Sequence, residues 1–128
     1  MIGKITLMIL LIVMITNSAF AQQVTRIADI VVDPAQLDSY QRELKIIGEV
    51  SMKNEPGVLM LFSVADSKQP NHITVIEIYA DSAAYQAHLT TEHFKKYKAA
   101  VKNMVRSLEL TDVTPLYKGF KPQVLNNP

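Results

Sequence analysis

The chain has 128 residues, the length of one ordinary domain, with 13 basic and 12 acidic side chains. Lys4 is the only charged residue among the first 21, so the rest of the chain carries 12 of each sign and is formally neutral. A neutral chain lacks the basic surface that nucleic-acid binding requires, so we expect no nucleic-acid partner. There is no cysteine, which excludes disulfides, thiol chemistry and cysteine-ligated metals.

The N-terminus has the pattern of a secretory signal peptide. Lys4 precedes an apolar run from Ile5 to Ile15, and the A-x-A cleavage pattern Ala19-Phe20-Ala21 follows. The alternative is an uncleaved membrane anchor, but a spanning helix needs roughly 20 apolar residues. We therefore expect residues 1–21 to be removed after Ala21. The mature protein would be secreted or periplasmic, with no membrane association after cleavage.

The first half of the mature chain predicts a strand, a helix and a second strand. Residues 24–32 are rich in β-branched side chains, and we expect Asp33 to begin a helix through a capping box with Gln36. That helix ends near residue 54, before Pro56-Gly57. Its apolar stripe is Leu37, Tyr40, Leu44, Ile47 and Val50. Residues 57–65 are apolar at nearly every position, which predicts a strand covered on both faces.

The second half continues with a hairpin partner, a divided helix and a last strand. The predicted ranges are 72–79 for the strand, 82–89 and 92–106 for the helices, and 108–114 for the strand. Thr90-Thr91 separates the helices, and Thr91 is the expected cap of the second. The C-terminal tail, residues 118–128, has no period and is either disordered or an arm on a partner chain.

This order is β-α-β-β-α-β, which predicts an α+β ferredoxin-like domain over residues 22–117, with an antiparallel sheet and helices on one face. The strand at 57–65 has apolar residues pointing both ways, and a monomer supplies a cover for only one side. A second copy is the simplest cover. We therefore expect a homodimer.

Three segments carry a resemblance to a known family. They are Glu55-Pro56-Gly57-Val58-Leu59, the strand end Glu77-Ile78-Tyr79-Ala80-Asp81, and Tyr85-Gln86-Ala87-His88-Leu89 followed by His93-Phe94. Over about residues 24–116, in segment order and spacing, the chain resembles the antibiotic biosynthesis monooxygenase (ABM) domain, and its quinol monooxygenase-like members most closely. The resemblance implies a dimeric α+β barrel. It also implies oxidation of quinols or polyketide aromatics by dioxygen with no metal, flavin or other cofactor.

One branch of that family degrades haem, and its pattern is not matched here. Those members have an axial histidine four residues after the phenylalanine that Phe94 resembles, and a tryptophan where His88 stands. Here the first position is Lys98, and the chain has no tryptophan. A protonated lysine is a poor haem ligand, so haem degradation is the less favoured expectation.

His88 and Glu77 are the candidate catalytic residues. A pocket histidine is suited to act as general base on a phenol or hydroquinone, whereas a structural histidine between helix and strand is the alternative. Glu77 interrupts an apolar strand, so its carboxylate must be paired or protonated. Arg26 is the expected ion-pair partner. The other interpretation is that Glu77 orients His88 or a substrate hydroxyl.

His93 follows His88 by five residues, about 140° around one continuous helix. The sequence leaves open whether the break at Thr90-Thr91 brings the two rings together, and we expect His93 at the surface or as a capping residue. The two histidines, even with Glu92, lack helix-borne metal spacing and a clear third ligand, so no metal is expected. The candidate substrate-binding residues are Tyr40, Met60, Phe62, Tyr79, Tyr85 and His93. The alternative for the aromatic residues and Met60 is that they only pack in the hydrophobic core.

Two hypotheses for function follow. The first is a cofactor-independent monooxygenase that oxidises a small aromatic or quinol substrate with dioxygen. The second is a non-catalytic dimeric module that binds a small apolar ligand or serves in stress response. A cavity near His88 that is large enough for an aromatic ring favours the enzyme, whereas a site filled by Tyr85, Phe62 and Met60 favours the module.

Overall fold

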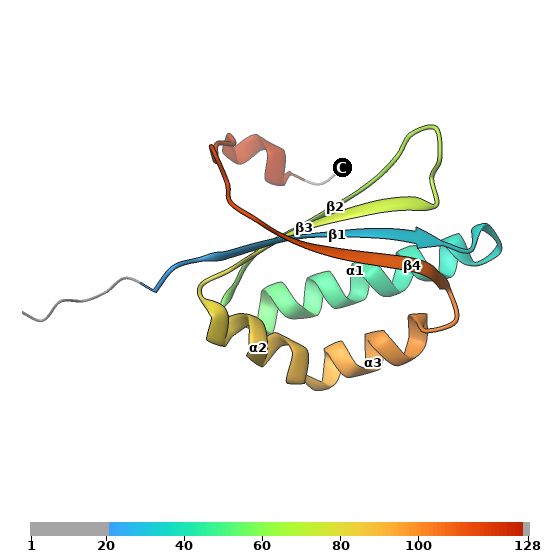
Figure 1. Cartoon of the computed structure of the whole chain (residues 1–128), viewed down its shortest axis with the longest axis horizontal. Helices are drawn as coiled ribbons and strands as arrows, with labels where there is room; N and C mark the ends of the chain where they lie inside the picture. The colour runs from blue at the N-terminus through green and yellow to red at the C-terminus, as the bar shows by residue number, and fades with distance from the viewer. Residues whose placement is uncertain (1–20, 127–128) are drawn as a thin grey trace, which may run out of the picture.

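A computed structural model of the protein describes residues 21–126 (Figure 1). The expected signal peptide therefore lies outside the described residues, apart from Ala21. Within the described range, no helix has the length and apolar character needed to cross a membrane.

The predicted ferredoxin-like α+β fold is confirmed. Four antiparallel strands form one sheet in the order β2-β3-β1-β4. The strands are β1 (Val24–Val32), β2 (Val58–Ala65), β3 (His72–Tyr79) and β4 (Val105–Val113). As predicted, β2 and β3 form a hairpin.

Three helices cover one face of the sheet (Figure 1): α1 (Leu37–Asn54), α2 (Ser82–Thr90) and α3 (Glu92–Val101). Alternate residues of β1 point toward them because strand side chains have a period of two. Ala28, Ile30 and Val32 are buried in one cluster with Tyr40 of α1 and Val101 of α3. Fully burying an aliphatic side chain stabilises a fold by about 1.5–3 kcal/mol, so this cluster fixes the helices on the sheet.

The predicted capping box at Asp33 is wrong. The Asp33 carboxylate accepts from the Ala35 amide at 3.0 Å, and the Gln36 side chain donates to the Asn103 carbonyl at 3.0 Å. The reason is a short 3-10 helix, η1 (Pro34–Gln36), that precedes α1. It turns Gln36 toward the α3–β4 connection.

The predicted end of the last helix is also wrong. The helix stops at Val101, and Val105 pairs with Val32 as the first residue of β4. Met104 and Val105 still pack against the core. Their apolar side chains therefore continue the helical spacing in the sequence. Pairing with β1 nevertheless makes Val105 part of a strand.

The sheet face opposite the helices carries exposed apolar side chains. Phe62 and Val64 of β2 are 52% and 45% exposed. The C-terminal segment, with the short helix η2 (Pro122–Leu125), lies on this side of the sheet (Figure 1). Its own apolar residues Leu116 and Tyr117 are 100% and 87% exposed. The sequence-based expectation of a dimer stays a prediction.

A candidate active site beside His88

A cavity of about 610 Å³ lies between the helices and the sheet. This volume is within the range of about 300–1,000 Å³ that small-molecule sites occupy. Four of the candidate residues line it with side chains on the helix side: Glu77, Tyr79, Tyr85 and His88. Phe62 borders the cavity too, although its pairing with Ile76 places its side chain on the face away from the helices. Leu89, Phe94 and Tyr97, which were not among the candidates, line it too.

The other three candidate residues are elsewhere. Tyr40 is fully buried, and its hydroxyl lies 2.8 Å from that of Tyr97. Met60 pairs with Ile78 in the sheet, and the alternation along β3 places both on the face away from the helices. His93 contacts a glutamate outside the lining.

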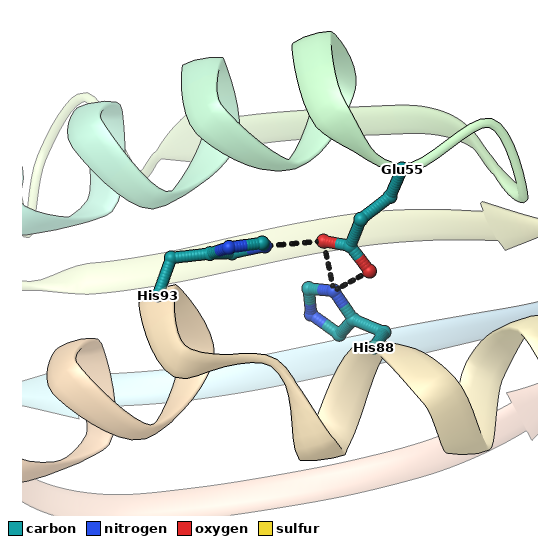
Figure 2. A group of neighbouring side chains, drawn as sticks. All are labelled: Glu55, His88 and His93. Carbon is teal, nitrogen blue, oxygen red and sulfur yellow. Dashed lines mark hydrogen bonds and ion pairs between the residues drawn. The ribbon is translucent and has the colours of Figure 1, made fainter.

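That glutamate is Glu55, and it lies between both histidines. Figure 2 shows Glu55 reaching from the end of α1 toward two rings carried by α2 and α3. His88 Nδ1 is 3.1 Å and 3.0 Å from the two carboxylate oxygens. His93 Nε2 is 2.6 Å from Oε2. In the sequence, Glu55 stands out only as part of the family motif, so it was not among the predicted site residues.

The turn after α1 brings Glu55 to this position. Its amide donates to the Ser51 carbonyl at 2.9 Å, and the Ala80 amide donates to the Gly57 carbonyl at 2.8 Å. A Cβ atom on Gly57 would lie 2.5 Å from the Cβ of Ala84 in α2. Glycine therefore permits the close approach that puts Glu55 beside His88.

The expectation that His93 is a surface or capping residue is wrong. Thr91 is extended, with φ −67° and ψ 148°, so α2 and α3 are separate helices. The Thr91 hydroxyl accepts from the Phe94 amide at 3.2 Å and donates to the His88 carbonyl at 2.8 Å. This predicted cap is confirmed. The break redirects the chain and lets both rings reach one carboxylate.

The hydrogen bonds determine the charge of Glu55. Burial raises its pKa, but hydrogen bonds from His93 and His88 outweigh that effect and hold the pKa below its ordinary value. The carboxylate is therefore ionised and can only accept. His88 must donate through Nδ1–H, so a neutral His88 ring has an unprotonated Nε2.

Glu77 has the opposite shift. Burial raises the pKa of its carboxyl group, against smaller lowering effects from the Tyr79 hydrogen bond and the charges of His88 and Arg26. The Tyr79 hydroxyl donates to it at 3.2 Å. The predicted Arg26–Glu77 ion pair is not formed. Arg26 Nε lies 3.0 Å from Asp112, and its guanidinium sits 4.5 Å above the Tyr85 ring centre.

Glu55, His88 and His93 also have the donor types of a metal site, with ligand atoms within 4.8 Å of one another. The third donor is Glu55 rather than Glu92, which corrects the sequence-based view that a third ligand is lacking. However, a 2.6 Å contact is shorter than the roughly 3.3 Å between two ligands of one tetrahedral zinc. As arranged, the three residues form a hydrogen-bonded cluster.

The fold and cavity define a ferredoxin-like α+β domain with a ligand-sized site. The model of the antibiotic biosynthesis monooxygenase family matches residues 23–100. A provisionally named antibiotic biosynthesis monooxygenase from Bacteroides thetaiotaomicron VPI-5482 is 51% identical, with a TM-score of 0.75, over 78% of this chain and 95% of that one. The chain therefore belongs to the antibiotic biosynthesis monooxygenase family, and the resemblance stated from the sequence is confirmed.

Two further structures are more distant. A provisionally named monooxygenase from Lactobacillus acidophilus NCFM is 30% identical with a TM-score of 0.71, over 73% of this chain but only 46% of that one. A protein from Pseudomonas aeruginosa, 24% identical over 77% of this chain and 98% of its own, has a TM-score of 0.70 and shares the fold. No curated protein matches the chain. Family membership suggests monooxygenase-like chemistry without naming a substrate.

Proposed function

We propose that this protein oxidises a small aromatic or quinol substrate with dioxygen in the cavity beside His88, without a prosthetic group. The observation that carries the proposal is the cavity itself, about 610 Å³ and lined by His88, Glu77 and three tyrosines. A ring system fits that volume. Tyr85 borders the cavity and does not fill it, and the side chains of Phe62 and Met60 lie on the face of the sheet away from the helices.

His88 is the proposed general base. Its Nδ1–H is held by Glu55, so Nε2 is free to accept a proton from a phenolic hydroxyl of the substrate. Loss of that proton makes the ring electron-rich enough to transfer an electron to dioxygen. For a hydroquinone the reaction balances with no other reductant. One oxygen atom enters the ring, the other leaves as water, and the product is a hydroxyquinone.

Glu77 is the proposed partner for a second substrate oxygen. Because burial raises the pKa of its carboxyl group, Glu77 is protonated over a wider pH range than an exposed glutamate. A protonated carboxyl can donate a hydrogen bond to a substrate oxygen. Tyr79 and Tyr85, whose ring centres are 5.2 Å apart, offer aromatic faces to the substrate ring.

Oxygen uptake with a panel of hydroquinones tests this proposal. The intact protein should consume dioxygen, and His88→Ala should lower kcat/KM by about 100-fold or more, the usual contribution of a general base. His72→Ala is the matched control because His72 is exposed and does not line this cavity. Uptake that is equal in the intact protein and His88→Ala would refute the base assignment. Quinol binding without uptake would instead support the non-catalytic binding module.

We also propose that the protein acts as a homodimer after export and removal of residues 1–21. Exposed apolar residues on β2 and in the C-terminal segment support the dimer. The signal-peptide pattern supports export. Intact mass measurement after secretion from a bacterial host tests the cleavage, with Gln22 expected as the first residue.

A further inference from the structure

The two histidines hold Glu55 unequally. His88 shares one N–H between both carboxylate oxygens, at 3.1 and 3.0 Å, whereas His93 makes a single contact of 2.6 Å to Oε2. Hydrogen bonds to an ionised acceptor shorten as they strengthen. The His93 contact is therefore the tighter one, and it fixes which way the carboxylate faces.

The cluster becomes more exposed from His88 to His93. The His88 side chain is 5% exposed, Glu55 12% and His93 24%. His88 lines the cavity, whereas Glu55 and His93 are outside its lining. A substrate in the cavity can therefore touch His88, while His93 can act on the reaction only through Glu55.

The break at Thr91 makes this arrangement possible. Side chains five positions apart on one helix point about 140° away from each other. Here the extended Thr91 ends α2, and its hydroxyl links the His88 carbonyl to the Phe94 amide. A helix interruption between two histidines thus places both rings on the same carboxylate.

We propose that His93 is a positioning residue that clamps Glu55, so that His88 keeps its proton on Nδ1 and presents an unprotonated Nε2 to the cavity. Without His93, the Glu55 side chain gains rotational freedom, and His88 is no longer confined to one tautomer. The purpose of the clamp rests on the proposed function. The tautomer itself can be observed without turnover.

Nitrogen NMR of protein labelled in the histidine rings reads the tautomer directly. In the intact protein the neutral His88 ring should carry its proton on Nδ1 only. His93→Leu, which removes the donor, should give a mixture of both tautomers. His93→Gln, whose amide N–H has a similar reach, should restore the single tautomer. An unchanged His88 spectrum in His93→Leu would overturn the proposal.

Oxygen uptake supplies the second measurement. His93→Leu should lower kcat about tenfold with KM within about twofold, a smaller loss than removing the base itself, and His93→Gln should recover most of it. Equal kcat in His93→Leu and the intact protein would contradict the clamp. If the intact protein consumes no oxygen, the proposed function fails, whereas the NMR result still decides the clamp.

Two threonines provide a matched pair. Thr91→Ala removes the cap that directs α3. Like His93→Leu, it should give a mixture of both His88 tautomers. Thr90→Ala removes only a hydroxyl that bonds the Ala87 carbonyl at 2.8 Å, so the tautomer should be unchanged. Stoichiometric zinc binding that requires both histidines would overturn the proposal, because ring nitrogens that ligate a metal carry no proton.

Discussion

Arg26 and Glu77 lie directly opposite each other in the register of β1 and β3, yet they do not form an ion pair with each other. Arg26 pairs with Asp112 on β4, and Glu77 accepts its hydrogen bond from Tyr79. The Glu77 carboxyl group therefore lies at the cavity without a contacting cation. Burial dominates its electrostatics and raises its pKa.

A first prediction concerns the pH dependence of stability. Because the folded-state pKa of Glu77 is raised, its contribution to stability is fully present below the unfolded value near 4.5 and is lost as pH rises through the folded value. Glu77→Gln should remove that loss, which amounts to about 1.4 kcal/mol for each tenfold difference between the folded and unfolded acid constants. Urea unfolding at pH 4.5 and pH 8 measures it.

The control for this prediction is Glu109→Gln, because Glu109 is exposed on β4. In Glu109→Gln, the unfolding free energy should change between the two pH values by the same amount as in the intact protein. A change of the same size in the intact protein and Glu77→Gln would show that Glu77 does not titrate differently in the folded state.

Two glycines of the α1 region should respond in opposite directions to alanine. Gly57→Ala places a Cβ 2.5 Å from that of Ala84, so the turn carrying Glu55 must move, which we expect to cost about 1–3 kcal/mol. Gly48 lies inside α1 with nothing within 4 Å of the new atom, so Gly48→Ala should stabilise by about 0.5–1 kcal/mol. Thermal unfolding of both variants tests the pair. Destabilisation by both would contradict the contact argument.

The sequence was sufficient for the fold because the periodicities of its elements agree with their burial. Residues 24–32 form the predicted strand, and the period of two along a strand puts Ala28, Ile30 and Val32 on one face, where all three are buried. The predicted end of the last helix fails because an apolar residue fits the pattern of two elements. Val105 continues the spacing of α3 but belongs to β4, and only the pairing with Val32 reveals this.

The site was predicted less completely. Glu77 was named because it interrupts an apolar strand, and His88 because a pocket histidine is suited to act as a general base. Both line the cavity. Glu55 was missed because it is 33 residues from His88, and no periodicity links the end of one helix to the last turn of another. Thr91 was recognised as a cap, but the direction that α3 takes after it depends on tertiary packing.

The dimer is the third prediction. The mature protein should scatter light as a dimer at micromolar concentration, because an apolar sheet face of this kind needs a cover. Val64 is 45% exposed on β2, on the face away from the helices, and does not line the main cavity. Val64→Lys should give a monomer, whereas Gln86→Lys, on exposed α2 surface, should remain dimeric. A monomeric intact protein would refute the prediction.

The fourth prediction concerns acid stability and depends on Glu55. Its pKa is lowered in the folded state, so its contribution to stability is present above the ordinary value of 4.5 and is lost as pH falls through the folded value. The lowered pKa of Asp66, caused by the amides of Lys68 and Gln69, gives a loss of the same sign. The intact protein should therefore lose stability between pH 5 and pH 3.

Glu55→Gln separates the two carboxylates. The variant cannot ionise at position 55, so its unfolding free energy should fall less steeply over the same pH range, while the share from Asp66 remains. The matched control is Glu92→Gln, because the Glu92 side chain is 94% exposed and, within residues 21–126, its only ion pair is a 3.6 Å surface contact with Lys95. Urea unfolding at half-unit pH intervals gives the three slopes. If Glu55→Gln and Glu92→Gln have the same acid slope, the histidines do not hold Glu55 as a carboxylate in solution.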